Sequence, residues 1–114
     1  MEFDASSVWK YQLVIQFSLA GTDVDRFDKL LDLEQQIDRV TADRSIAELD
    51  GNDVGAGEFN IFLYTDRPRE AFEYLRPIVE KVEPPSEYKV AYRDLKGEEF
   101  HIVWPRDLKH FDVA

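Results

Sequence analysis

The chain has 114 residues, enough for one hydrophobic core and too few for two, so we expect a single domain whose core spans about residues 8–104, followed by an irregular tail at 105–114. Its formal charge of −10 repels phosphate backbones and anionic membranes, which argues against nucleic-acid or membrane partners and favours a cationic protein. With no cysteine, disulfides and Cys-ligated zinc are excluded, as expected in a reducing compartment. The N-terminus lacks a signal-peptide pattern and no apolar run approaches the roughly 20 residues that span a bilayer, so we expect a cytoplasmic protein.

The first predicted element is a strand over residues 9–19. Its odd positions are all apolar, whereas its even positions are polar except Val14, and this alternation is typical of a sheet with one covered face. Gly21 and Thr22 end the strand, and Thr22 or Asp23 can cap a helix whose apolar stripe runs to about Val40. The pattern therefore predicts an antiparallel sheet with its helices on one face.

The middle of the chain predicts a hairpin followed by a helix. A weaker strand around Arg44–Asp50 and a stronger strand at Phe59–Thr65 flank a long loop with three glycines. The helix begins at Arg67-Pro68, and Pro77 predicts a kink or a restart near Tyr74–Pro77 before Pro84-Pro85 ends the helix. Strands at 88–93 and 99–104 then flank a tight turn around Gly97.

The resulting order is β-α-β-β-α-β-β, an α+β fold. Its first six elements match the split βαβ, or ferredoxin-like, arrangement, with an extra C-terminal strand. In that arrangement the strands at 9–19 and 59–65 are central and the strand at 44–50 lies at an edge. The alternative is another α+β order of the same elements.

The face of the sheet without helices is a candidate surface for a protein partner or a flat ligand. Asn60, Phe62 and Tyr64 are expected there beside the even residues of the first strand. His101 and Val103 join them if Phe100, Ile102 and Trp104 point inward, and Lys89 and Arg93 then flank the surface. In the alternative interpretation, the C-terminal segment folds across this face, or the exposed aromatic residues have no function.

The glycine-rich segment 50–58 invites metal and phosphate interpretations, and neither fits. Asp50, Asn52 and Asp53 resemble the start of a calcium loop, but Val54 and Ile61 occupy positions where ligands are required. A phosphate loop requires glycines before a helix, whereas these precede a strand. We therefore expect no metal and no cofactor. The segment is either a wide hairpin connection built on positive φ angles or a recognition loop that presents Asp50, Asn52, Asp53 and Glu58.

The first helix carries two unusual acidic features. Asp25, Asp28 and Asp32 lie opposite its apolar stripe and form an acidic ridge, which is either a solvated face or a docking strip for a basic partner. Glu34 falls along the middle of the apolar face. We expect it to pair with an Arg or Lys at the edge of the core, and a catalytic acid is the alternative.

No set of catalytic residues emerges from the sequence. The serines include no G-x-S-x-G turn, and His101 and His110 show no ligand spacing. The first hypothesis is a non-catalytic protein-binding module that uses the acidic ridge, the glycine-rich segment or the aromatic face. The second is a small enzyme or ligand-binding domain whose site is lined by Glu58, Asn60, Tyr64 and His101. Charged side chains on both edge strands leave monomer and dimer open.

The segment D-G-N-D-V-G-A-G-E-F-N-I-F-L-Y-T-D-R-P resembles that of a group of small, acidic, uncharacterised bacterial proteins with the pattern D-G-x-D-x-G-x-G-E-x-N-I-F-x-x-T-D-x-P. The resemblance covers about residues 48–105 and supplies no catalytic residues. Small acidic proteins of this kind sometimes act as immunity proteins that neutralise toxins, and this analogy of size and charge implies an immunity-like or regulatory role.

Overall fold

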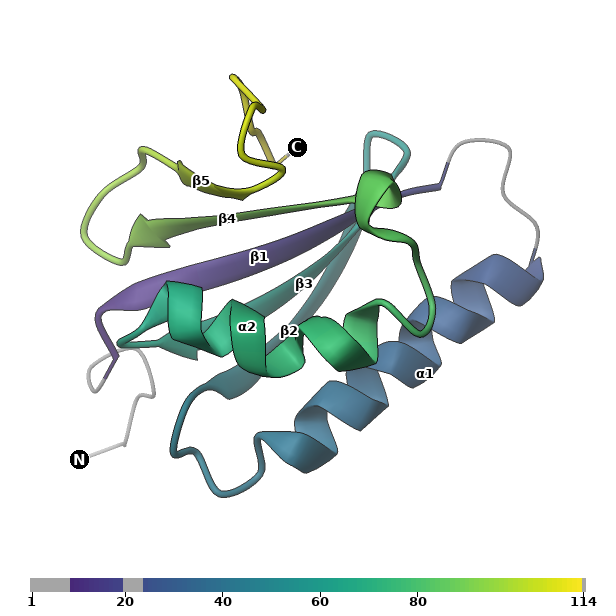
Figure 1. Cartoon of the computed structure of the whole chain (residues 1–114), viewed down its shortest axis with the longest axis horizontal. Coiled ribbons are helices and arrows are strands. Elements are labelled where there is room, and N and C mark those ends of the chain that lie inside the picture. The colour runs from purple at the N-terminus through teal and green to yellow at the C-terminus, as the bar shows by residue number, and fades with distance from the viewer. Residues whose placement is uncertain (1–8, 20–23, 114) are drawn as a thin grey trace.

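The computed structural model describes residues 9–19 and 24–113, which form a mixed α+β domain with a five-stranded antiparallel sheet and two α-helices (Figure 1). Across the sheet the strands follow the order β2-β3-β1-β4-β5, so β1 is central and β2 and β5 are the edges. In chain order the elements are β1 (Tyr11–Ser18), α1 (Val24–Val40), β2 (Glu48–Gly55), β3 (Glu58–Thr65), α2 (Pro68–Val79), a 3₁₀ turn (Pro85–Glu87), β4 (Tyr88–Asp94) and β5 (His101–Trp104).

The main core lies between the sheet and the helices. Leu13, Ile15 and Phe17 of β1 are fully buried there, as the alternation of the strand predicts. Both helices cover this same face, because their buried residues belong to the same cluster. These residues are Leu30, Leu33 and Ile37 of α1 and Ala71, Phe72, Leu75 and Val79 of α2.

A second, smaller core lies on the other face of the sheet, under the C-terminal tail. Val14 of β1 and Ala91 of β4 are fully buried there, and Phe111 of the tail is 9% exposed. The Phe111 ring lies 5.1 Å from that of Phe100, centroid to centroid. Residues 105–113 contain no helix or strand, but hydrophobic burial extends well past residue 104. Val14, the one apolar even position in β1, is therefore explained by the tail that covers it.

The predicted long loop between β2 and β3 is wrong. β2 continues to Gly55 and β3 starts at Glu58, so only Ala56 and Gly57 connect them. Their φ angles are 52° and 75°, and two positive values in a two-residue hairpin connection are the mark of a type I′ turn. The glycine-rich segment is thus mostly an edge strand, and Asp50, Asn52 and Asp53 project from a strand.

The helices differ from expectation at one point. Helix α2 runs through Pro77 as a single helix, so the predicted restart is absent. Glu73, whose carbonyl loses its hydrogen bond to residue 77, is exposed, so water can satisfy that carbonyl. Pro68 occupies the first turn, as expected. The predicted cap at Thr22 or Asp23 lies outside the described residues. Among the described residues, no helix has both the length and the apolar character to cross a membrane.

Candidate functional site

Charge is distributed unevenly between the two ends of the sheet. Residues 24–66, which form α1, β2 and β3, contain 11 acidic and 4 basic side chains, whereas residues 67–113 contain 10 and 9. The first group lies at the β2 edge and the second lies mostly at the β4–β5 end (Figure 1). The negative potential is therefore concentrated on one side of the molecule.

The acidic ridge of Asp25, Asp28 and Asp32 is exposed on α1, as predicted. Asp32 accepts a hydrogen bond of 3.0 Å from the Gln36 amide. Within the described residues, none of the three carboxylates forms an ion pair with a basic side chain. Like charges at this spacing repel by a few tenths of a kcal/mol per pair on an isolated helix. A cationic partner would relieve this repulsion.

Glu34 joins α1 to the edge of the sheet. The Glu34 Oε1 atom accepts a 2.7 Å hydrogen bond from Nδ2 of Asn52 in β2. The predicted Arg or Lys partner is wrong, because the outer strand brings an amide to this position instead. Asn52 is thus oriented toward the helix, whereas its neighbour Asp53 lies opposite Asn60 on the other face.

Strand β2 has a free outer edge that carries further acidic groups. Asp50 and Asp53 are exposed, and a register shift between Leu49 and Gly51 interrupts the ladder with β3. Bulges and charges are common protections of an edge strand against pairing. Within the part of the chain that the structure describes, no group of three His, Asp or Glu side chains could hold a metal ion. Together with the acidic ridge, Asp50 and Asp53 form what we term the acidic edge.

Asn60, Phe62 and Tyr64 do lie on the face opposite the helices, across from Gln16, Val14 and Gln12 of β1. This face is not open, however. Phe62 packs against the cluster formed with the tail, and Asn60 is fully buried. The alternative in which the C-terminal segment folds across the face is therefore correct.

Val103 packs in the main core, and His101 does not join this group either. His101, in β5, lies opposite Tyr92 of β4, and the centroids of the two rings are 5.1 Å apart. The Tyr92 side chain packs against the main core. Ile102 instead packs against the second core, because the tail provides an apolar cover on that side. The predicted ligand site of Glu58, Asn60, Tyr64 and His101 is therefore not assembled, since His101 lies on the other face of the sheet.

A buried polar pair lies beneath the tail. Nε2 of Gln16 donates to Oδ1 of Asn60 at 3.0 Å and to the backbone oxygen of Asp112 at 2.9 Å. Both amides are nearly inaccessible, with Gln16 3% exposed and Asn60 0%. Nδ2 of Asn60 is buried without a hydrogen-bond partner among the described residues. An unpaired buried group of this kind lowers the stability of the fold by about 1–3 kcal/mol.

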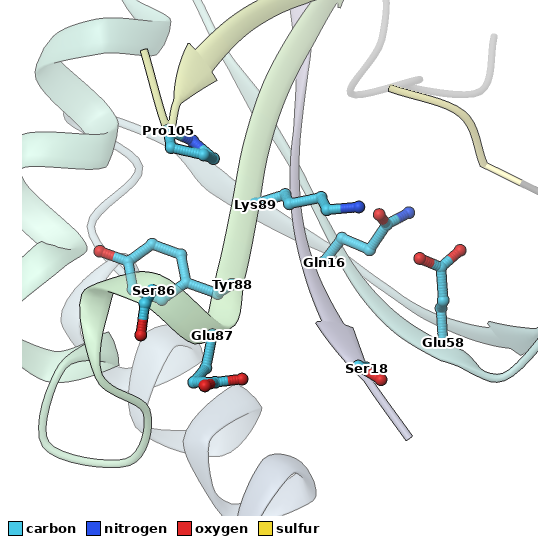
Figure 2. Close-up of a pocket in the computed structure, with 8 residues that line it drawn as sticks. All are labelled: Gln16, Ser18, Glu58, Ser86, Glu87, Tyr88, Lys89 and Pro105. Atoms are coloured by element: carbon cyan, nitrogen blue, oxygen red, sulfur yellow. The ribbon is translucent and has the colours of Figure 1, made fainter. Parts of the chain in front are cut away.

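Beside Gln16 lies a polar hollow of about 210 Å³ (Figure 2). Gln16 and Lys89 are directly paired across β1 and β4, and Ser18 and Glu58 are paired across β1 and β3. In Figure 2 the Gln16 side chain lies between those of Lys89 and Glu58. The hollow is lined by Gln16, Ser18, Glu58, Ser86, Glu87, Tyr88, Lys89 and Pro105. Glu58 was predicted from the sequence as a site residue, whereas Gln16 and Lys89, on the face and at its flank, were not.

A charged network supports the wall that Tyr88 provides. The Tyr88 hydroxyl and Nε of Arg76 both donate to Oε2 of Glu80. The Tyr88 hydrogen bond, reinforced by Arg76, lowers the pKa of Glu80, while burial and the neighbouring carboxylate raise the pKa of Tyr88. Arg76 also lies over the Trp104 ring at 4.4 Å. We assign this network to positioning β4 and β5, since every group in it has a partner.

Comparisons of the chain with protein-family models, with curated proteins and with solved structures found no match.

Proposed function

We propose that the chain is a non-catalytic module that binds a cationic protein through its acidic edge. The observation that carries the proposal is that residues 24–66, which include the neighbouring elements α1 and β2, hold 11 acidic and 4 basic side chains, a net charge of −7 out of the chain's −10. The Asn52–Glu34 hydrogen bond joins the two elements, and the buried residues of α1 anchor the helix on the sheet, so the carboxylates of the ridge are held on one side of the molecule. Such a surface accelerates encounter with a basic partner and selects against acidic ones.

A defined peptide tests where a cation binds. We would titrate a lysine-rich decapeptide into the ¹⁵N-labelled protein at low salt and compare three forms of the chain. The ridge variant combines Asp25→Asn, Asp28→Asn and Asp32→Asn. The control variant removes the same number of exposed charges elsewhere, with Glu98→Gln, Glu99→Gln and Asp107→Asn.

The ridge variant should bind the peptide about tenfold more weakly, because exposed charge pairs contribute about 0.2–1 kcal/mol each. The control variant has the same net charge and should bind almost as well as the unmodified protein. Affinity should also fall steeply between 50 and 300 mM salt, because the Debye length falls to less than about 10 Å over this range. Equal losses in the two variants would show that only net charge matters, and the proposal would be withdrawn.

The natural partner can be sought with the same pair of variants. We propose a regulatory or immunity-like role, supported by the analogy with small acidic proteins that neutralise toxins. Cross-linking in the source cells should capture one basic protein with the unmodified chain and the control variant, and should lose it with the ridge variant. A toxin gene beside the coding gene would support the immunity-like form of the role. Capture that does not depend on the ridge would exclude this surface.

We also propose that the chain has the split βαβ, or ferredoxin-like, topology, with β5 added at one edge. Support comes from the element order before β5 and from the place of β1 between β3 and β4. Cross-strand amide contacts measured by NMR for the β1–β3, β1–β4 and β2–β3 pairs would test it. A β1 strand that paired with only one neighbour would exclude this topology.

A further inference from the structure

The polar hollow contains two opposite charges that do not neutralise each other. Glu58 is half-buried and Lys89 is exposed, and neither forms an ion pair or a hydrogen bond with a described side chain. A partly buried carboxylate normally acquires a partner, because desolvation penalises an isolated charge. Both groups are therefore available to a ligand.

The sheet geometry keeps the two charges apart. Glu58 is paired with Ser18, and Lys89 is paired with Gln16, two residues back along β1. The Cα atoms of Glu58 and Lys89 are therefore about 12 Å apart, because they are offset by two strands across the sheet and by two residues along it. Their side chains extend into the same hollow from opposite sides of Gln16 (Figure 2). A small molecule between them would meet a carboxylate at one end and an ammonium at the other.

The floor of the hollow is pre-oriented by the buried polar pair. Since Nε2 of Gln16 donates to both Asn60 and Asp112, a flipped amide would place its oxygen against two acceptors. The orientation is therefore fixed, and the Gln16 oxygen is left without a hydrogen bond among the described residues. It is an acceptor available to the hollow. The unpartnered Asn60 amide is explained as the cost of holding Gln16 in this position.

We propose that the polar hollow binds a small zwitterion of the α-amino acid type, whose ammonium group lies at Glu58 and whose carboxylate lies at Lys89. The hollow, at about 210 Å³, is smaller than the pockets of about 300–1,000 Å³ that bind drug-sized ligands, so its ligand must be smaller than a typical drug molecule. Glu87 adds a second carboxylate at the rim. It disfavours amino acids with acidic side chains, so neutral and basic ones should bind best.

The ligand panel on the unmodified protein is the first test. Glycine, alanine, lysine and glutamate would be titrated into the ¹⁵N-labelled chain, with acetate and methylamine as ligands that carry only one of the two charges. Glycine, alanine and lysine should shift the amide signals of residues 16–18, 58–60 and 87–89, and glutamate should bind more weakly. Absence of shifts in these segments at millimolar ligand would overturn the proposal, as would equal responses to acetate or methylamine.

Variants then test the two ends of the site. Lys89→Met and Glu58→Gln should each weaken amino-acid binding at least about tenfold, since each removes a charge-assisted hydrogen bond. The matched controls are Lys96→Met and Glu99→Gln, which remove exposed charges between β4 and β5 and should leave affinity unchanged. Unchanged binding in either site variant, with a native-like spectrum, would refute the assignment. The site does not include the acidic ridge, so its failure would leave the protein-binding proposal standing.

Discussion

Removal of the Phe111 side chain is the sharpest test of the tail as part of the fold. Phe111 is 9% exposed and packs with Val14 and Ala91 against the second face of the sheet. Phe→Ala substitutions in cores cost about 3–5 kcal/mol. Since Phe111 lies in a segment without regular structure, the site can partly collapse, and we expect a loss of about 3 kcal/mol. This is a large part of the 5–15 kcal/mol that stabilises a typical domain.

Urea denaturation followed by circular dichroism measures this loss directly. For a chain of this length, about 3 kcal/mol corresponds to a melting temperature lower by roughly 10 °C. If the shortened side chain also releases the tail in the folded state, the dependence of the free energy on urea should weaken, because less surface is newly exposed on unfolding. Val54→Ala, at a side chain that is 48% exposed, is the control and should change stability by less than about 0.5 kcal/mol. A Phe111→Ala loss below about 1 kcal/mol would refute the structural role of the tail.

Three further substitutions have outcomes fixed by local physics. Tyr88→Phe should remove a loss of stability at alkaline pH. The pKa of Tyr88 is raised in the folded state, so the unmodified protein should lose stability as the pH rises above the unfolded pKa of about 10. Urea midpoints measured from pH 8 to 11.5 should fall for the unmodified protein and not for the variant. Ala56→Asn should raise stability by about 0.5 kcal/mol, since Asn tolerates the positive φ of the type I′ turn, and a lower melting temperature would contradict that turn assignment. Asn60→Asp removes an Nδ2 group that has no hydrogen bond, but it buries a carboxylate. Burial should raise the pKa of this carboxyl in the folded state, so the variant should lose stability as the pH rises above about 4. A loss of stability that does not depend on pH would indicate a packing defect instead.

The sequence predicts the helix-covered face well because that face depends on residue period. The alternation in β1 and the apolar stripes of α1 and α2 identify residues that the main core buries. The β2–β3 connection was missed because its turn is Ala-Gly rather than the Asn-Gly that signals a type I′ hairpin. Three glycines then suggested a loop where the chain forms an edge strand. At Pro77 the sequence predicts a kink or a restart of the helix. The restart is absent because the remaining packing of α2 outweighs one lost hydrogen bond, and the kink stays a prediction.

The candidate site was less predictable because it depends on contacts between distant segments. The exposure of the acidic ridge followed from helical spacing alone. Asn60 is buried on the face that the tail covers, and residues 105–113 of the tail show no periodic pattern that would reveal where they pack. The two residues that meet at Gln16, Asn60 and Asp112, are separated from it by 44 and 96 positions. The apolar Val14 in an otherwise polar set was the one local sign that this face is covered.

The tail and the polar hollow are coupled through one side chain. Gln16 lines the hollow, and its amide nitrogen holds the backbone of Asp112. A ligand that contacts Gln16 in its present orientation would therefore bind most tightly when the tail is docked, and by linkage it would stabilise the docked tail by the same free energy. An amino acid that binds the unmodified protein should accordingly bind Phe111→Ala more weakly, although Phe111 does not line the hollow. Hydrogen exchange would show whether the tail is released in Phe111→Ala. If the tail is released and the variant binds the amino acid as tightly as the unmodified protein, the tail and the hollow are not coupled.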